Sequence, residues 1–126
     1  MKKQISISGA PAPIAPYSQA ILAGNTLYIS GQIPANPMTG ELVMDSVEDA
    51  THQIMANIKN LLNEAGMDLS NVVKCSIFMK DMNDYGAINT VYGSYFKDTT
   101  PPAREAVQVA RLPKDVSVEI SCIAVK

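Results

Sequence analysis

Arg104 and Glu119 are the two charged side chains of this sequence whose surroundings could support chemistry. Arg104 follows Pro101–Ala103, a stiff segment that leads straight into a strand pattern. A guanidinium held in this way can bind a carboxylate through two parallel hydrogen bonds. Glu119 lies between Val118 and Ile120, where a carboxylate is unusual unless it has a partner or a function. The pair suits a small anionic substrate, with Glu119 orienting a water as general base.

A structural explanation fits each of these side chains equally well. Arg104 could be a solvated arginine at a strand edge, and Glu119 could hydrogen-bond Gln108 across a hairpin. The alternation of residues 104–111 and 116–121 predicts two strands joined by loop 112–115, a register that pairs Gln108 with Glu119. Because opposed residues share a face, we expect Arg104 and Glu119 on the same side of the sheet, about 13 Å apart along the strands.

Weaker candidates lie elsewhere in the chain. Tyr17 and Ser30 are single polar residues in a hairpin pattern, and a tyrosine there more often packs than binds. Gly31 lets a ligand approach the backbone, or simply marks a bulge. Asn89 is unfavourable inside a helix pattern, which suggests a role for its side chain. The single histidine, His52, has no nearby cluster of metal-binding side chains, so no metal site is expected.

The composition is that of one domain of ordinary size, residues 1–126. Apolar residues make up 47% of the chain and charged residues 17%, with a net charge of −2 and no basic run. This balance argues against nucleic acid and anionic membranes as partners. No membrane-spanning segment or signal peptide is visible, which predicts a cytoplasmic protein. Cys75 and Cys122 lie in apolar strand patterns and are expected to be buried thiols rather than a disulfide.

The chain divides into alternating strand and helix patterns. Residues 4–8 predict a strand, and residues 17–23 and 26–32 predict a hairpin around the turn Gly24–Asn25. Ser46 can cap a helix that ends near Gly66, and a strand follows over 72–80. A second helix begins at about residue 83, before the two final strands. The order predicts an α+β domain with about six strands and two helices.

Two helices can cover only one face of such a sheet. The other face of the last two strands is not fully polar, because Ala106, Ala110, Ile123 and Val125 are assigned to it. An exposed face of this kind is typical of an interface or a ligand site, so we expect a homo-oligomer with sites near its seams. A monomer with a mildly apolar surface is the alternative.

Motifs along essentially the whole chain resemble the RidA/YjgF family of reactive-intermediate (enamine/imine) deaminases. They are Ala12–Gln19, Ile29–Pro34, Val73–Asp81, Asn89–Tyr92 and Pro102–Ala124, in the order and close to the spacing of the family. The resemblance implies a chorismate-mutase-like α+β fold, with a six-stranded mixed sheet and two helices packed on one face. It also implies a homotrimer with three clefts, each lined by two subunits.

The activity that the resemblance implies is hydrolysis of 2-imino or 2-enamino acids, such as 2-iminobutanoate and 2-iminopropanoate, to 2-oxo acids and ammonia. No metal or organic cofactor is implied. Arg104 matches the arginine that holds the substrate carboxylate, and Glu119 matches the acid that positions the attacking water. The remaining matches line the pocket: Tyr17, Ser30, Gly31 and Asn89. The chain departs from many members at Ala106, where they have a cysteine.

Two other functions remain open at this stage. A non-catalytic trimer could bind small carboxylates, although such a role needs Arg104 but not the water-activating Glu119. An RNA-acting protein, a ribonuclease or translation inhibitor, is reported within the family. The acidic balance, the absence of tryptophan and the lack of a basic stripe with exposed aromatic residues argue against it.

Overall fold

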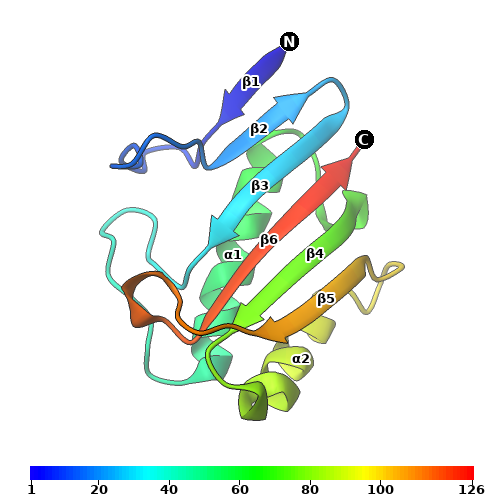
Figure 1. The fold of residues 1–126 in the computed structure, drawn as a ribbon. Helices are drawn as coiled ribbons and strands as arrows, with labels where there is room; N and C mark the ends of the chain where they lie inside the picture. Colours follow the sequence, from blue (N-terminus) through cyan, green and yellow to red (C-terminus); the bar gives the residue numbers. More distant parts are fainter.

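Six strands and two α-helices form the fold in the computed structural model, which describes residues 1–126 (Figure 1). The strands are β1 (Lys2–Ile5), β2 (Ala20–Ala23), β3 (Thr26–Gln32), β4 (Val72–Met79), β5 (Ala103–Gln108) and β6 (Val118–Val125). The helices are α1 (Val47–Glu64) and α2 (Tyr85–Ser94), with short 3₁₀ turns η1 (Leu69–Asn71), η2 (Met82–Asp84) and η3 (Pro113–Asp115).

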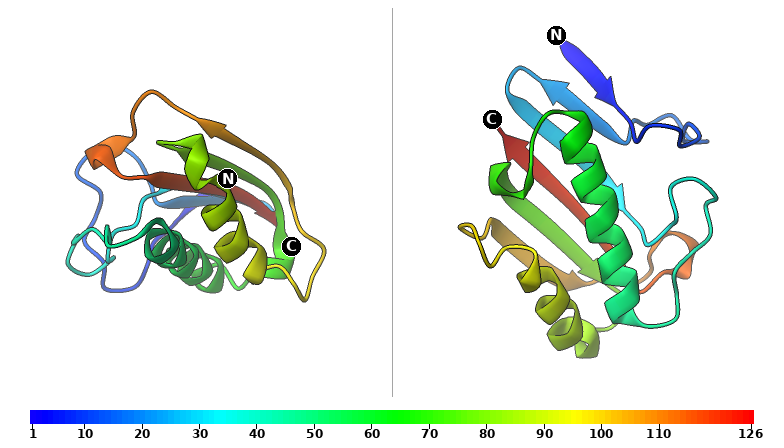
Figure 2. Two further views of the ribbon diagram at one scale, coloured as in Figure 1. Left: turned by 90° about the horizontal axis from the view of Figure 1, so that it is seen from below. Right: turned by 180° about the vertical axis from the view of Figure 1, so that it is seen from behind.

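The six strands make one mixed sheet in the order β1-β2-β3-β6-β4-β5. All neighbouring pairs are antiparallel except β4 and β5, which are parallel and are connected through α2. Both helices lie on the same face of the sheet, and the other face is left open (Figure 2). The predicted α+β class, with six strands and two helices on one face, is therefore confirmed.

The predicted hairpin between the last two strands is wrong. β4 lies between β5 and β6 and pairs with both of them. Parallel neighbours need a long crossover, and α2 provides it between β4 and β5, which leaves the other edge of β4 to β6. In this register Phe78 lies between Val107 and Glu119, so Glu119 faces Phe78 and not Gln108.

Arg104 and Glu119 consequently lie on opposite faces of the sheet, contrary to the prediction from the hairpin register. Arg104 aligns with Cys75, and Cys75 with Cys122, and both cysteines are buried on the helix-covered face. Glu119 alternates with the fully buried Val118 and Ile120, so its side chain is on the open face. The same register places Val107 on the open face, with 42% exposure.

The core forms between α1 and the covered face of the sheet. The Ser46 hydroxyl caps α1, as predicted, by accepting a hydrogen bond from the backbone N of Asp49 at 3.0 Å. Ile54, Ile58 and Leu61 recur at helical spacing and are at most 1% exposed. Each such side chain contributes about 1.5–3 kcal/mol through burial, so packing on the sheet holds α1 in place.

A β-bulge interrupts β3 opposite Ser121 of β6. The pairs Ile29–Cys122 and Gln32–Ile120 leave two residues of β3, Ser30 and Gly31, opposite one residue of β6. A second bulge, on β4, moves Val73 into solvent at 47% exposure, although its alternation predicts a buried side chain. The first strand also begins and ends earlier than the predicted 4–8.

Cys75 and Cys122 are buried free thiols, as the sequence predicts. The structure places them opposite each other on β4 and β6. No helix has the length and apolar character needed to cross a membrane.

Candidate functional site

The Arg104 guanidinium lies against α2 in a cage of polar and aromatic side chains. Its Nη1 donates to Asn89 Oδ1 at 2.8 Å, and its Nη2 donates to Tyr85 Oη at 2.9 Å. The guanidinium carbon is 5.1 Å from the centroid of the Tyr92 ring and 5.7 Å from that of Tyr85. Cation–π attraction and two hydrogen bonds together fix the direction of the cation.

The local sequence explains this cage. Tyr85 and Asn89 are four residues apart on α2, and Tyr92 follows three residues later, so all three project from one face of the helix. Asp81 caps the preceding turn η2 by accepting from the backbone N of Asn83, which fixes where α2 begins. Burial raises the pKa of Tyr92, so the ring faces Arg104 as a neutral phenol.

A pocket of about 420 Å³ opens beside Arg104. Asn89, Tyr92 and Pro102 contribute to its wall. Arginine has five N–H donors, and Arg104 uses two of them within the chain, so three remain for a ligand. The volume and the free donors suit a small carboxylate.

Glu119 differs from Arg104 in having no partner. It is half-buried on the open face, and no hydrogen bond or ion pair in the chain involves its carboxylate. Burial raises the pKa of Glu119 above its ordinary range. A carboxylate with unoccupied lone pairs and a raised pKa is suited to binding and deprotonating a water molecule.

Gly31 allows the β3 bulge to pass directly over Glu119. A Cβ built on Gly31 would lie 2.7 Å from Glu119 Cδ and would also contact Oε2. Real Cβ atoms do not approach so closely, so any larger residue must displace the carboxylate. The glycine is therefore required by close approach of the acid rather than by a positive φ angle.

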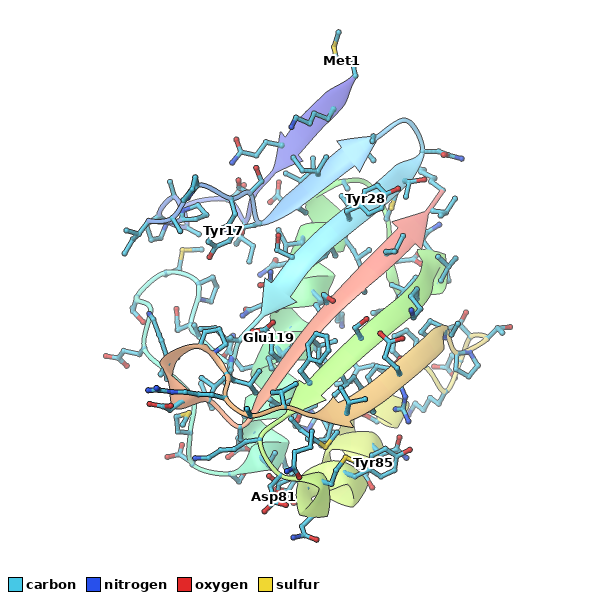
Figure 3. All side chains as sticks on the ribbon, in the orientation of Figure 1. Met1, Tyr17, Tyr28, Asp81, Tyr85 and Glu119 are labelled. Atoms are coloured by element: carbon cyan, nitrogen blue, oxygen red, sulfur yellow. The ribbon has the colours of Figure 1, made fainter.

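Tyr17 and Ser30 lie near this bulge. Tyr17 is 57% exposed and lines, together with Gly31, a separate pocket of about 210 Å³. The Ser30 hydroxyl donates to the Ser18 carbonyl at 2.6 Å, which ties β3 to the loop before β2. In Figure 3, Tyr17 lies beside the start of β2, Glu119 near the start of β6 beside the end of β3, and Tyr85 on α2.

The predicted site residues thus form two groups, which the structure does not bring together in one chain. We call the first the cation half-site; it consists of the predicted Asn89 and Arg104 together with Tyr85 and Tyr92, which were not predicted. We call the second the acid half-site, made of Tyr17, Ser30, Gly31 and Glu119. β5 and β6 are two strand spacings apart, about 10 Å, and Arg104 and Glu119 also point to opposite faces.

Sequence reasoning missed Tyr85 and Tyr92 as partners of Arg104. Their spacing from Asn89 on one helix face was the available signal. His52, the sole histidine, hydrogen-bonds Tyr95 Oη through Nδ1 at 2.8 Å and belongs to neither half-site. The largest pocket, about 690 Å³ between α1, η1 and the end of α2, contains none of the predicted site residues.

These features define a small α+β domain that presents a caged cation on one face of its sheet and a free carboxylate on the other. Comparison with known proteins agrees with the fold of this domain. Residues 7–126 match the model of the family described as Endoribonuclease L-PSP. The chain belongs to this family, which is also called RidA/YjgF, and the resemblance in its motifs is confirmed.

Relatives within the family carry different names. A RutC family protein from Pyrococcus horikoshii is 52% identical over 126 residues, covering 100% of this chain and 99% of the relative. A 2-iminobutanoate/2-iminopropanoate deaminase from Escherichia coli is 44% identical over 128 residues, covering 100% and 99%. The crystal structure of E. coli TdcF with bound serine has a TM-score of 0.92 and 41% identity, covering 98% of each chain.

Proposed function

We propose that this protein hydrolyses 2-imino and 2-enamino acids, such as 2-iminobutanoate and 2-iminopropanoate, to 2-oxo acids and ammonia. The observation that carries the proposal is the caged Arg104, which keeps free N–H donors beside a pocket of small-molecule size. The deaminase name of the E. coli relative and the serine bound by TdcF, itself a small carboxylate, support the same substrate class. We expect the protein to act in the cytoplasm, where such intermediates arise.

The chemistry needs only a held carboxylate and a positioned water. Arg104 binds the substrate carboxylate, and the protonated imine makes the neighbouring carbon electrophilic. Water adds to that carbon while Glu119 takes up its proton, giving a tetrahedral amino alcohol. Glu119 then passes this proton to nitrogen, and the C–N bond breaks as ammonia leaves. The hydroxyl oxygen forms the new carbonyl and releases its own proton to the Glu119 carboxylate. Because imine hydrolysis is intrinsically fast, positioning suffices and no covalent nucleophile is needed.

We further propose that each site is shared between two copies of the chain. A substrate of a few heavy atoms cannot contact Arg104 and Glu119 of one chain, since they lie on opposite faces about 10 Å apart. A neighbour that seats its acid half-site against the cation half-site completes the constellation. Exposed apolar side chains on the open face, among them Tyr28 and Val107, favour such an association. The assembly is the homotrimer that the family resemblance implies.

The test generates the substrate in place, because 2-imino acids decay in water. L-2-aminobutanoate is oxidised by an L-amino acid oxidase with semicarbazide present, which traps the imine as it forms. Wild-type protein should divert the imine to 2-oxobutanoate and ammonia and slow the trapping, and Arg104→Ala should lose this effect. Binding of 2-oxobutanoate without any diversion would instead identify a carboxylate-binding protein.

Because the matching family is described as Endoribonuclease L-PSP, single-stranded RNA should also be tested as a substrate. Degradation of single-stranded RNA at a rate unaffected by Arg104→Ala would place the activity outside the proposed site. We expect no degradation, because the net charge is −2 and the only histidine is bonded to Tyr95, away from both half-sites.

A further inference from the structure

The pocket beside Arg104 contains a second cation, Lys97. The pocket has a volume of about 420 Å³, and its lining includes these two basic side chains and no acidic one. Neither of the two ion pairs in the chain involves Lys97, so its ammonium has no anionic partner of its own. The cation half-site therefore opens onto a cavity with two positive charges, of which only Arg104 has a role in the proposed function.

The two cations lie toward opposite ends of this pocket. Arg104 is hydrogen-bonded to Asn89 at 2.8 Å, whereas Lys97 comes eight residues after Asn89, just beyond α2. The backbone N of Phe96 donates to the Gly93 carbonyl at 3.1 Å, so the helical winding continues to the residue before Lys97. At a rise of about 1.5 Å per residue, the backbones of Asn89 and Lys97 are about 12 Å apart along the helix axis.

Apolar side chains contribute to the wall of the same pocket, namely Phe96, Pro101 and Pro102. A ligand that satisfies both cations therefore has an anionic group at each end and a short hydrocarbon chain between them. An ion-pair contact takes up to about 4 Å at each end, which leaves about 4 Å of the separation between the two ends of the pocket. Three or four carbon–carbon bonds of about 1.5 Å cover this distance.

We propose that the site takes dicarboxylic 2-imino acids, the imines of acidic amino acids, with Lys97 binding the side-chain carboxylate. Arg104 then binds the carboxylate next to the imine carbon. This inference rests on the proposed function, because it names the substrate class of the same site. Lys97 is exposed, so its ion pair with the substrate selects between acidic and neutral side chains and adds little to overall affinity.

The experiment measures the binding of 2-oxoglutarate and of its 5-methyl ester by calorimetric titration. The ester keeps the chain length and removes only the second charge. Wild type should bind 2-oxoglutarate about three- to fivefold more tightly than the ester, the range of an exposed ion pair, and Lys97→Gln should bring this ratio to about one. Lys97→Glu should favour the ester. Lys59→Gln is the matched control, because it removes an exposed lysine beside Tyr95, outside this pocket.

Turnover tests the same selection. Oxidation of L-glutamate by an amino acid oxidase supplies 2-iminoglutarate, and its diversion from semicarbazide is compared with that of 2-iminobutanoate. Lys97→Gln should lower the ratio of the two kcat/KM values about three- to fivefold, through a higher KM for 2-iminoglutarate. Lys59→Gln should keep the ratio of wild type.

The outcomes separate this inference from the function on which it rests. If wild type neither binds 2-oxoglutarate nor diverts either imine, both proposals fail. If wild type diverts 2-iminobutanoate but Lys97→Gln keeps both ratios, the role of Lys97 is overturned while the deaminase stands. Equal losses in Lys59→Gln overturn it too, because they reflect the overall charge of the protein. Preferential binding of 2-oxoglutarate that needs Lys97, without diversion of any imine, supports the ligand class and overturns the hydrolysis.

Discussion

The cation half-site and the acid half-site differ in whether their charged side chain has partners within the chain. Arg104 has two hydrogen bonds and two aromatic neighbours, so its direction is settled before a ligand arrives. Glu119 has no partner, and burial raises its pKa, so it stays free to exchange a proton. A group that binds benefits from being held, whereas a group that moves protons must not be neutralised by a neighbour. The difference shows which residue anchors and which reacts.

Arg104→Ala is expected to have the largest effect on activity. It removes two charge-assisted hydrogen bonds to the substrate carboxylate, worth about 1.5–3 kcal/mol each, so kcat/KM should fall by about 10²–10⁴-fold. Arg111→Ala is the matched control, because Arg111 pairs only with the exposed Asp115. The activity of both variants is measured as the rate at which they divert the imine from trapping by semicarbazide. Comparable losses in the two would mean that the cage around Arg104 has no special role.

Glu119→Gln should act on turnover and leave binding intact. Removal of a general base typically costs about 10²–10⁴-fold in kcat, while the affinity for 2-oxobutanoate depends on Arg104 and should stay within about twofold. Glu105→Gln is the matched control on the same open face, since it affects only exposed contacts of Glu105, with Lys74 and with the Ser76 hydroxyl. If Glu119→Gln instead lost affinity for 2-oxobutanoate and kept its kcat, Glu119 would be a binding residue and not the general base.

The pKa of Glu119 also predicts opposite pH responses of activity and stability. The base must be ionised, so kcat/KM should fall with decreasing pH through a midpoint above 4.5, and Glu119→Gln should abolish this limb. Because folding raises this pKa, the folded state binds more protons, and stability falls as pH rises above 4.5. Glu119→Gln should therefore melt higher than wild type at pH 7, with the gap closing below about pH 4. An equal gap at both pH values contradicts this.

Gly31→Ala tests the close contact within the acid half-site. The new Cβ must displace the Glu119 carboxylate, so we expect kcat to drop about tenfold with little loss of stability, because the displaced group is the end of a flexible chain. Gly86→Ala is the control: its Cβ meets open space in α2 and should stabilise the protein by about 0.5–1 kcal/mol. Full activity in Gly31→Ala would show that the position of Glu119 is unimportant.

Asn89→Ala should have the smallest effect of the series. It removes one of the two acceptors that hold Arg104 and leaves Tyr85 and the Tyr92 ring in place. A loss of about 1 kcal/mol, roughly fivefold in kcat/KM, is expected. The exposed Asn60→Ala on α1 controls for removal of an asparagine from a helix. A loss as large as that of Arg104→Ala would mean that Asn89 contacts the substrate directly.

Local signals in the sequence predicted the elements and part of the site. The Ser46 cap, the Gly24–Asn25 turn and the spacing of Ile54 and Ile58 each act within a few residues, so α1 and the first hairpin follow from sequence. Glu119 stands out for a similar reason, because a charge between two buried strand positions is visible in the sequence itself.

Strand partners did not follow from the same signals. Alternation shows which residues share a face within one strand, but not which strand lies beside it. The strand of Arg104 pairs with β4 because α2 returns the chain alongside it, a choice made by packing of the whole helix. This single error reversed the face of Arg104 relative to Glu119. The same error explains why Tyr85 was not predicted as a partner of Arg104, because the two residues are in contact only when α2 packs over β5.

Mixing two inactive variants tests the shared site most directly. Arg104→Ala and Glu119→Gln, each inactive alone, are unfolded together, refolded into mixed oligomers and assayed for imine diversion. If one copy supplies the cation and its neighbour supplies the acid, an intact Arg104 meets an intact Glu119 at roughly a quarter of the sites, and that fraction of wild-type activity should return. If no activity returns from oligomers shown by mass to contain both variants, the two groups act within one chain or not together at all.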